Sequence, residues 1–226
     1  MNDKERLAKH AAKLVEDGMI VGLGTGSTAD YFIEKLARRR IKEGLRVNCV
    51  ASSVVSLLKA QRLGLPMVAI EHLTQLDLYV DGADEVTTEH TLLKGQGADL
   101  VKEKLLARAS DQFIVLVDKS KMVKNIGDRF LIPVEVMPFA WQLVKQSLKQ
   151  FGGHGALRQN SNGSGLAVTS YGSLVLDMAF DKKLDSTELD AILNSTPGVV
   201  EHGIFNGLAS CVLLADKGAV QELELK

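Results

Sequence analysis

Three carboxylates and a lysine stand close together in the middle of the chain. The first cluster reads Asp-Gly-Ala-Asp-Glu and runs from Asp81 to Glu85, and Lys94 begins a Lys-Gly-Gln-Gly segment that precedes Glu103. Carboxylates beside a lysine can move protons and can stabilise negative charge that develops on a substrate oxygen. The candidate catalytic residues are therefore Asp81, Asp84, Lys94 and Glu103.

The segment before Asp81 predicts how the first cluster is held. Residues 76–80 form a short, mostly apolar run of strand-forming residues, which is typical of a buried strand. The carboxyl end of such a strand would deliver Asp81 and Asp84 into a crevice. An Asp-Gly pair is also common in ordinary turns. We favour a functional site because the lysine–glycine segment follows at short range.

A helix is expected after the Lys-Gly-Gln-Gly segment. Ala98, Val101 and Leu105 recur at helical spacing, so a helix that begins near Ala98 would carry Glu103 in its second turn. The two glycines of the Lys-Gly-Gln-Gly segment stand just before this helix. They would let backbone N–H groups approach an anion at the helix N-terminus.

A second glycine-rich turn lies near the start of the chain. The apolar run 19–23 leads into Gly-Thr-Gly-Ser-Thr-Ala at 24–29, and a helix pattern follows. The letters fit a dinucleotide fingerprint, but the next strand, at 46–51, ends in two serines and lacks the acid that binds the ribose hydroxyls. A tight structural turn is the plain alternative. We favour a site for phosphate or another small anion at Thr25, Gly26, Ser27 and Thr28.

Composition limits the classes of function. The 226 residues are 46% hydrophobic and 24% charged, with a net charge of −1. This balance is typical of a globular protein and argues against nucleic acid or an anionic membrane as the main partner. The five histidines and two cysteines show no metal-ligand spacing, so no metal site is expected. The absence of an apolar leader or a membrane-length apolar run predicts a cytoplasmic protein.

The pattern of elements predicts two domains. Strands alternate with helices in the first half, which is typical of a parallel α/β sheet. From Asp128 onward the chain reads as a small α+β unit with antiparallel strands. The expected division is a Rossmann-like catalytic domain at 1–127 plus 206–226, and a small α+β domain at 128–205.

Taken together, these motifs closely resemble those of the ribose-5-phosphate isomerase A family. Agreement extends over nearly the whole chain, and the Asp-Gly-Ala-Asp-Glu segment followed at this spacing by Lys-Gly-x-Gly is its most specific part. The resemblance implies a Rossmann-like domain with a smaller ferredoxin-like domain, in a homodimer or a dimer of dimers. It also implies a sugar phosphate as the ligand, with no cofactor and no metal.

The activity that the resemblance implies is the interconversion of D-ribose 5-phosphate and D-ribulose 5-phosphate, in the non-oxidative branch of the pentose phosphate pathway. Glu103 would move a proton between C2 and C1 through an enediolate. Asp81, Asp84 and Lys94 would open the sugar ring, shuttle the hydroxyl proton and stabilise the oxyanion. Lys4 is a further candidate for the phosphate. The implied substrate-binding residues are Thr25, Gly26, Ser27, Thr28, Asp81, Gly82, Ala83, Asp84, Lys94, Gly95, Gln96, Gly97 and Lys121.

Two other functions remain open at this point. An amino-sugar-phosphate isomerase or deaminase on the same fold would also place carboxylates beside a phosphate site. A non-catalytic sugar-phosphate sensor is the second alternative. The chain departs from the usual family pattern at Gln96 and at Asp99. We expect Asp99 in the first helical turn, where its charge would act on Glu103.

Overall fold

The computed structural model describes residues 2–181 and 183–223. The chain forms two compact units. Unit 1 consists of Met1–Ala83, Lys102–Met122 and Gly207–Lys226, and unit 2 consists of Asp84–Val101 and Val123–Asn206. The sequence-based boundaries differ from this division, because they assign residues 84–101, 123–127 and 206 to the first domain. Strands within 84–101 pair with a strand of unit 2, which accounts for the first of these differences.

Unit 1 is built on a six-stranded sheet. Its order is β13-β12-β6-β3-β1-β2, and all neighbouring strands are parallel except β12 and β13. The strands are β1 (Ile20–Leu23), β2 (Asn48–Ala51), β3 (Leu76–Gly82), β6 (Ser110–Asp118), β12 (Cys211–Asp216) and β13 (Ala219–Glu222). Because β1 lies between β2 and β3, the strand order reverses there. The carboxyl ends of β1 and β3 therefore meet at the switch point where ligands bind in open parallel sheets.

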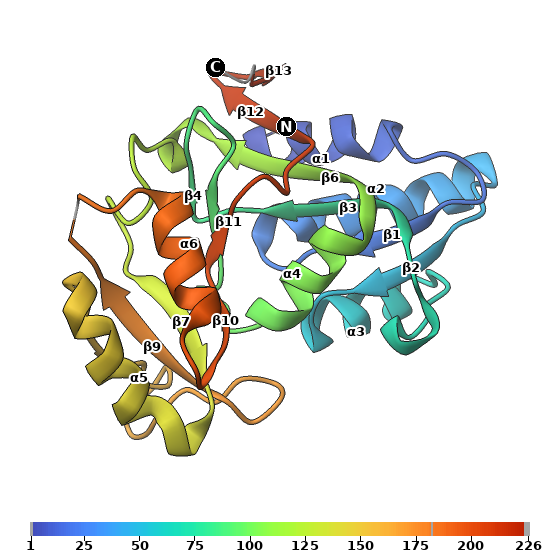
Figure 1. Ribbon diagram of the computed structural model, residues 1–226. Coiled ribbons are helices and arrows are strands. Elements are labelled where there is room, and N and C mark those ends of the chain that lie inside the picture. The colour runs from blue at the N-terminus through green and yellow to red at the C-terminus, as the bar shows by residue number, and fades with distance from the viewer. Residues whose placement is uncertain (1, 182, 224–226) are drawn as a thin grey trace. The chain divides into compact units, whose positions relative to one another are not determined.

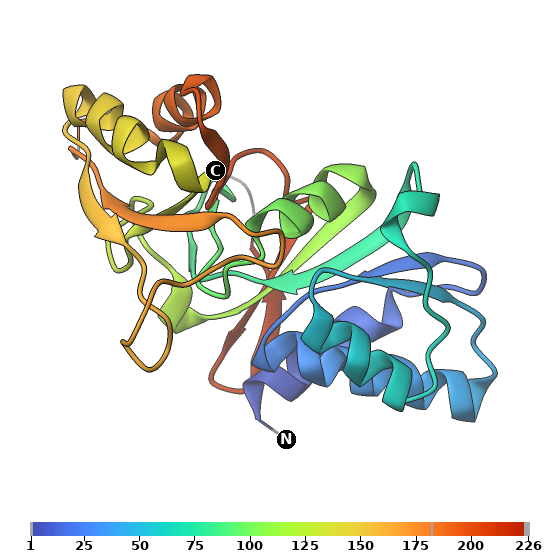
Figure 2. The same ribbon diagram turned by 90° about the horizontal axis from the view of Figure 1, so that it is seen from below.

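Four helices belong to this sheet. They are α1 (Asp3–Lys13), α2 (Ser27–Glu43), α3 (Val54–Arg62) and α4 (Leu100–Ala109). Helices α1, α2 and α3 cover one face, and α4 lies against the opposite face (Figures 1 and 2). Leu78 and Val80 of β3 belong to the core under α1 and α2. Side chains alternate along a strand, so Tyr79 and Asp81 point to the face that carries α4.

Helix α4 buries a different face from the one that the sequence pattern predicts. It begins at Leu100 rather than near Ala98, whose φ of 63° is left-handed. Asp99 therefore precedes the helix. Leu105 is 52% exposed, whereas Glu103 and Lys104 are buried together with Leu106. The apolar periodicity was misleading because two charged residues occupy buried positions of this helix.

Unit 2 contains two antiparallel sheets. The larger has the order β10-β7-β9-β8, and the smaller has the order β11-β5-β4. Their strands are β4 (Glu85–Val86), β5 (Leu92–Leu93), β7 (Ile132–Val136), β8 (His154–Leu157), β9 (Leu174–Ala179), β10 (Val199–His202) and β11 (Ile204–Phe205). Helices α5 (Trp141–Leu148) and α6 (Ser186–Ser195) contribute Val144, Leu148, Leu189 and Leu193 to the core of this unit. Short 3-10 turns occur at Ile70–His72, Lys119–Lys121, Pro138–Ala140 and Lys149–Phe151. The expected fold class, a parallel α/β domain with a smaller antiparallel α+β domain, is confirmed.

Glu85, the last residue of the Asp-Gly-Ala-Asp-Glu segment, anchors a loop of unit 2. Its side chain is buried. It accepts hydrogen bonds from the backbone N–H groups of Gly127 at 2.6 Å, Arg129 at 2.7 Å and Phe130 at 2.8 Å. Bonds of this kind, to a charged acceptor, contribute more to stability than neutral ones.

Glu85→Gln is therefore expected to lower the free energy of unfolding. An amide presents only one acceptor oxygen, so at least one of the three N–H groups loses its bond to a charged acceptor, and such a bond is worth about 1.5–3 kcal/mol. Urea denaturation followed by circular dichroism measures this change. The control is Glu89→Gln, at an exposed position, which should change stability by less than about 0.5 kcal/mol. Equal stability of the two variants would contradict the anchoring role.

Candidate active site

Asp81 lies near the end of β3, at the switch point of the unit 1 sheet. Its side chain is fully buried. Oδ1 accepts hydrogen bonds from the N–H groups of Thr25 at 3.0 Å and Gly82 at 2.7 Å, and Oδ2 accepts the Tyr79 hydroxyl at 2.5 Å. Donors from both sides of the switch point thus fix the orientation of this carboxylate.

Two glycines of β1 and its following loop make this arrangement possible. A Cβ on Gly24 would lie 2.1 Å from Oδ1 of Asp81, and a Cβ on Gly22 would lie 2.6 Å from the Tyr79 ring. Neither distance is compatible with a side chain other than hydrogen. The glycine-rich turn therefore also serves the neighbouring strand, because it gives the carboxylate and the phenol their space.

The hydroxyl of Thr25 lies within a cluster of serines. It donates to Ser53 Oγ at 2.7 Å and lies 2.9 Å from Ser52 Oγ and 3.3 Å from Ser56 Oγ. Ser56 in turn donates to the carbonyl of Gly24 at 2.6 Å. The two serines at the end of β2, where a dinucleotide site would have an acid, hold the turn in shape instead.

The N-terminus of α2 offers backbone donors to an anion. The helix begins at Ser27, and its N-cap residue, Gly26, has a φ of 100° and no side chain to cap the helix. The first N–H groups of a helix have no acceptor within the helix, and its dipole favours negative charge there. Nζ of Lys4 donates to Ser27 Oγ at 2.7 Å, which brings a cation to this end of the helix.

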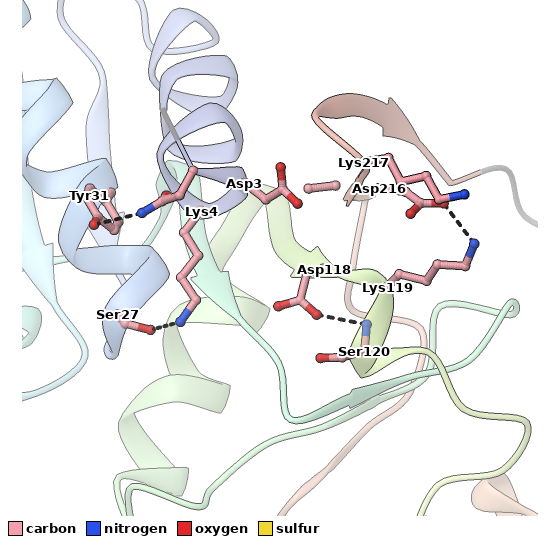
Figure 3. Close-up of a pocket in the computed structure, with 11 residues that line it drawn as sticks. Asp3, Lys4, Ser27, Tyr31, Asp118, Lys119, Ser120, Asp216 and Lys217 are labelled. Carbon is pink, nitrogen blue, oxygen red and sulfur yellow. Dashed lines mark hydrogen bonds and ion pairs between the residues drawn. The ribbon is translucent and has the colours of Figure 1, made fainter.

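A cavity of about 540 Å³ lies beside this helix end within unit 1 (Figure 3). Lys4 and Ser27 line it together with residues at the carboxyl ends of β6 and β12 and in the turns after them. Lys119 points to Asp216 and donates to its carboxylate at 2.8 Å. Lys121, the other lysine of that turn, is half-buried and does not line this cavity.

Glu103 lies on α4 with only 6% of its surface exposed. Burial raises the pKa of Tyr79 well above its ordinary value, and the charges of Asp81 and Glu103 raise it further. The phenol therefore stays protonated and can donate to Asp81 at any physiological pH. Since both charges act on one phenol, unit 1 brings Asp81 and Glu103 into the same environment.

Unit 2 holds the other two catalytic candidates. The Lys94–Gly97 loop follows β5, and the Lys94 N–H donates to the carbonyl of Gly203 at 2.9 Å. The Lys94 ammonium lies 5.8 Å from the centre of the Phe205 ring. The N–H of Gln96 donates to Oδ2 of Asp84 at 3.3 Å. The loop and Asp84 are thus joined directly.

Few side chains in the described residues are suited to metal or thiol chemistry. Within 2–181 and 183–223, no cluster of three or more His, Cys, Asp or Glu side chains has a geometry that could hold a metal ion. Cys49 and Cys211 are both free thiols, and burial raises the pKa of each to about 12. None of the helices in the same residues is both long and apolar enough to cross a membrane.

Comparison with known proteins identifies the family. The model of the ribose 5-phosphate isomerase A (phosphoriboisomerase A) family matches residues 48–219. The chain belongs to this family. Ribose-5-phosphate isomerase A of Synechococcus sp. is 42% identical over 214 residues, which cover 94% of this chain and 92% of the relative. The enzyme of Thermococcus kodakarensis is 40% identical over 222 residues, covering 98% and 97%.

Solved structures of the isomerase family share the fold. Ribose 5-phosphate isomerase A from Methanocaldococcus jannaschii has a TM-score of 0.92 at 39% identity, covering 98% of this chain and 97% of its own. A D-ribose-5-phosphate isomerase in complex with phospho-erythronic acid has a TM-score of 0.94 at 36% identity, covering 99% and 100%.

Sequence reasoning missed Tyr79 and the serine cluster. Tyr79 reads as an ordinary core residue of an apolar strand, and its position two residues before Asp81 is the one available signal, since i and i+2 share a face. Ser56 lies on a helix and carries no motif. Its contact with the turn is a tertiary one, so only the structure reveals it.

Gly24→Ala is expected to reduce kcat/KM by about 100-fold, because the new methyl group must displace the Asp81 carboxylate and a misplacement of about 1 Å can cost that much. Steady-state kinetics with ribose 5-phosphate measures the loss. Gly165→Ala is the control, since a Cβ there meets only the amide end of the Asn160 side chain. Wild-type kinetics in a folded Gly24→Ala protein would show that the position of Asp81 is unimportant.

Proposed function

We propose that Glu103 is the base of the isomerisation, and that Asp81, Asp84 and Lys94 handle the hydroxyl protons and the developing negative charge. As a member of the ribose 5-phosphate isomerase A family, the chain interconverts D-ribose 5-phosphate and D-ribulose 5-phosphate. The observation that carries the assignment is that Asp81, fixed by three donors, and the buried Glu103 both act on the Tyr79 phenol.

The reaction requires two proton movements. In the open aldose the carbonyl is at C1, and the base removes the proton from C2 to give an enediolate. Return of this proton to C1, with transfer of the hydroxyl proton from O2 to O1, gives the ketose. A single carboxylate that reaches both carbons can carry the proton from C2 to C1, so one buried glutamate suffices for this step.

Charge that develops on the substrate oxygens needs donors. The Lys94 ammonium and the N–H groups of Gly95 and Gly97 supply them, in a loop whose Gln96 N–H is directed to Asp84. A positioned donor of this kind is worth about 10²–10³ in rate. Gly82 and Ala83 connect the two aspartates, and by resemblance they contact the sugar.

The phosphate is bound by the N-terminus of α2. Ser27, Thr28 and the backbone after Gly26 supply donors, and Lys4 supplies a positive charge through its contact with Ser27. Thr25 contributes chiefly through its backbone, because its hydroxyl is engaged by the serines. Lys121 is a second cation candidate by resemblance. The related enzyme solved with phospho-erythronic acid, a phosphorylated ligand, supports a phosphate site.

The family match favours this isomerase over an amino-sugar-phosphate enzyme or a sensor. By the same resemblance we propose that the chain acts as a homodimer or a dimer of dimers, in the cytoplasm, in the non-oxidative branch of the pentose phosphate pathway. Multi-angle light scattering of the purified protein tests the assembly, and a monomer that isomerises at the full rate would refute it.

Glu103→Gln should lower kcat by at least about 100-fold, because a positioned base contributes about 10²–10⁴ and the amide cannot accept the proton. A coupled assay with ribose 5-phosphate measures the rate, and calorimetric titration with the same substrate checks that binding persists. Glu16→Gln, at an exposed position, is the control. More than a tenth of the wild-type rate in Glu103→Gln would assign the base to another residue.

Lys4→Ala should raise KM for ribose 5-phosphate by about 10–100-fold, because a hydrogen bond to a charged group is worth about 1.5–3 kcal/mol. The same variant should leave the much slower reaction with free ribose unchanged. Lys9→Ala, which removes an exposed lysine from the same helix, is the matched control. Equal effects of Lys4→Ala on ribose and on its 5-phosphate would contradict a phosphate-binding role.

A further inference from the structure

We propose that Arg158 is a positioning residue, which orients the backbone of the Lys94–Gly97 loop for catalysis. The proposal rests on the function proposed above for this loop, and it adds a residue that lies more than 60 positions away along the chain. Nη1 of Arg158 donates to the carbonyl of Gly95 at 2.9 Å and to that of Gln96 at 3.1 Å. One guanidinium nitrogen thus binds two successive carbonyls of the loop.

Arg158 is itself held rigidly. Its Nε and Nη2 donate to the two carboxylate oxygens of Asp177 on β9, at 2.9 Å and 2.6 Å. Its own N–H donates to the carbonyl of Val175 at 2.8 Å. The side chain is 13% exposed. A bidentate pair of this geometry fixes the plane of the guanidinium.

The planarity of the peptide bond turns these contacts into an orientation of N–H groups. In a trans peptide the C=O of one residue and the N–H of the next point in opposite directions. With the Gly95 carbonyl on Arg158, the N–H of Gln96 must point the other way, and it donates there to Oδ2 of Asp84 at 3.3 Å. With the Gln96 carbonyl also on Arg158, the N–H of Gly97 likewise points away from the arginine.

The loop needs such support because its backbone is unusual. Gly95 has a φ of 99°, and Ala98 has a φ of 63° although it carries a Cβ. At the far end of the loop, Asp99 accepts a hydrogen bond from the Ser170 hydroxyl at 2.7 Å. Contacts from Arg158, Asp84 and Ser170 together hold a conformation that the loop's own sequence does not favour.

The charge of Arg158 points to positioning rather than to substrate binding. Its guanidinium is paired with Asp177, so the pair as a whole has no net charge to offer a phosphate. Its donors are directed to the carboxylate and to the two carbonyls. A lysine has a single ammonium group in place of the planar, forked guanidinium, so it cannot bind these three acceptors in one plane.

The test uses Arg158→Ala and Arg158→Lys in the full-length protein. With ribose 5-phosphate, kcat should fall by about 100-fold in the alanine variant, with a much smaller change in KM, because the loop N–H groups are displaced from the developing charge. The lysine variant should recover only part of this loss. Hydrogen exchange of the 94–99 amides, measured by mass spectrometry, should become at least about tenfold faster in Arg158→Ala.

Two further variants keep the result decisive. Asp177→Asn, which keeps the shape of the partner, should lower kcat relative to the wild type, by less than about 100-fold, and should speed the exchange of the 94–99 amides. If the alanine variant does not fold, wild-type kcat and wild-type exchange in Asp177→Asn would overturn the positioning role. Arg46→Ala removes a comparable arginine–aspartate pair at an exposed site of unit 1, and it should leave kcat and the exchange of 94–99 unchanged.

The outcomes separate this proposal from the function on which it rests. Loss of isomerase activity in Glu103→Gln, together with wild-type kcat and wild-type exchange of 94–99 in both Arg158 variants, would overturn the positioning role alone. Full activity of Glu103→Gln would overturn the catalytic assignment, and the exchange measurement would still decide whether Arg158 orients the loop, because it requires no turnover.

Discussion

The buried carboxylate of Asp81 is the interaction on which the unit 1 site depends. A charge without solvent is tolerated only where donors surround it, and here they come from Thr25, Gly82 and Tyr79. Each donor imposes its own requirement. The Thr25 N–H reaches Asp81 only because of the turn after β1, and this turn needs glycine at position 24 to leave space for the carboxylate. The Tyr79 hydroxyl reaches Asp81 because the two residues lie on the same face of β3.

Much of this architecture could be predicted from sequence because local patterns encode it. The apolar run before Asp81 and the glycine-rich turn after residue 23 each mark the carboxyl end of a parallel strand. Strand β1 ends at Leu23 as predicted, whereas β3 continues past residue 80 to Gly82 and includes Asp81. That the two ends are neighbours follows from the strand order. Strand order depends on tertiary packing, which no local pattern reports.

The errors have physical causes as well. The buried face of α4 was predicted from apolar periodicity, which fails where a helix buries charged residues such as Glu103 and Lys104. Glu85 belongs to the same acidic segment as Asp81 and Asp84, yet it binds the backbone of a loop more than forty residues further along the chain. The contacts of Arg158 with Gly95 and Gln96 span an even longer stretch of sequence. Spacing rules cannot detect partners at such separations.

The hydroxyl cluster around Thr25 has a consequence for how the protein responds to ionic strength. Thr25, Ser52, Ser53 and Ser56 carry no charge, so dissolved salt does not screen the bonds that shape this turn. The contact that we propose between Lys4 and an incoming phosphate would be partly exposed and electrostatic, and the Debye length falls to about 3 Å at 1 M salt. Added salt should therefore weaken the capture of substrate while the geometry around Asp81 persists.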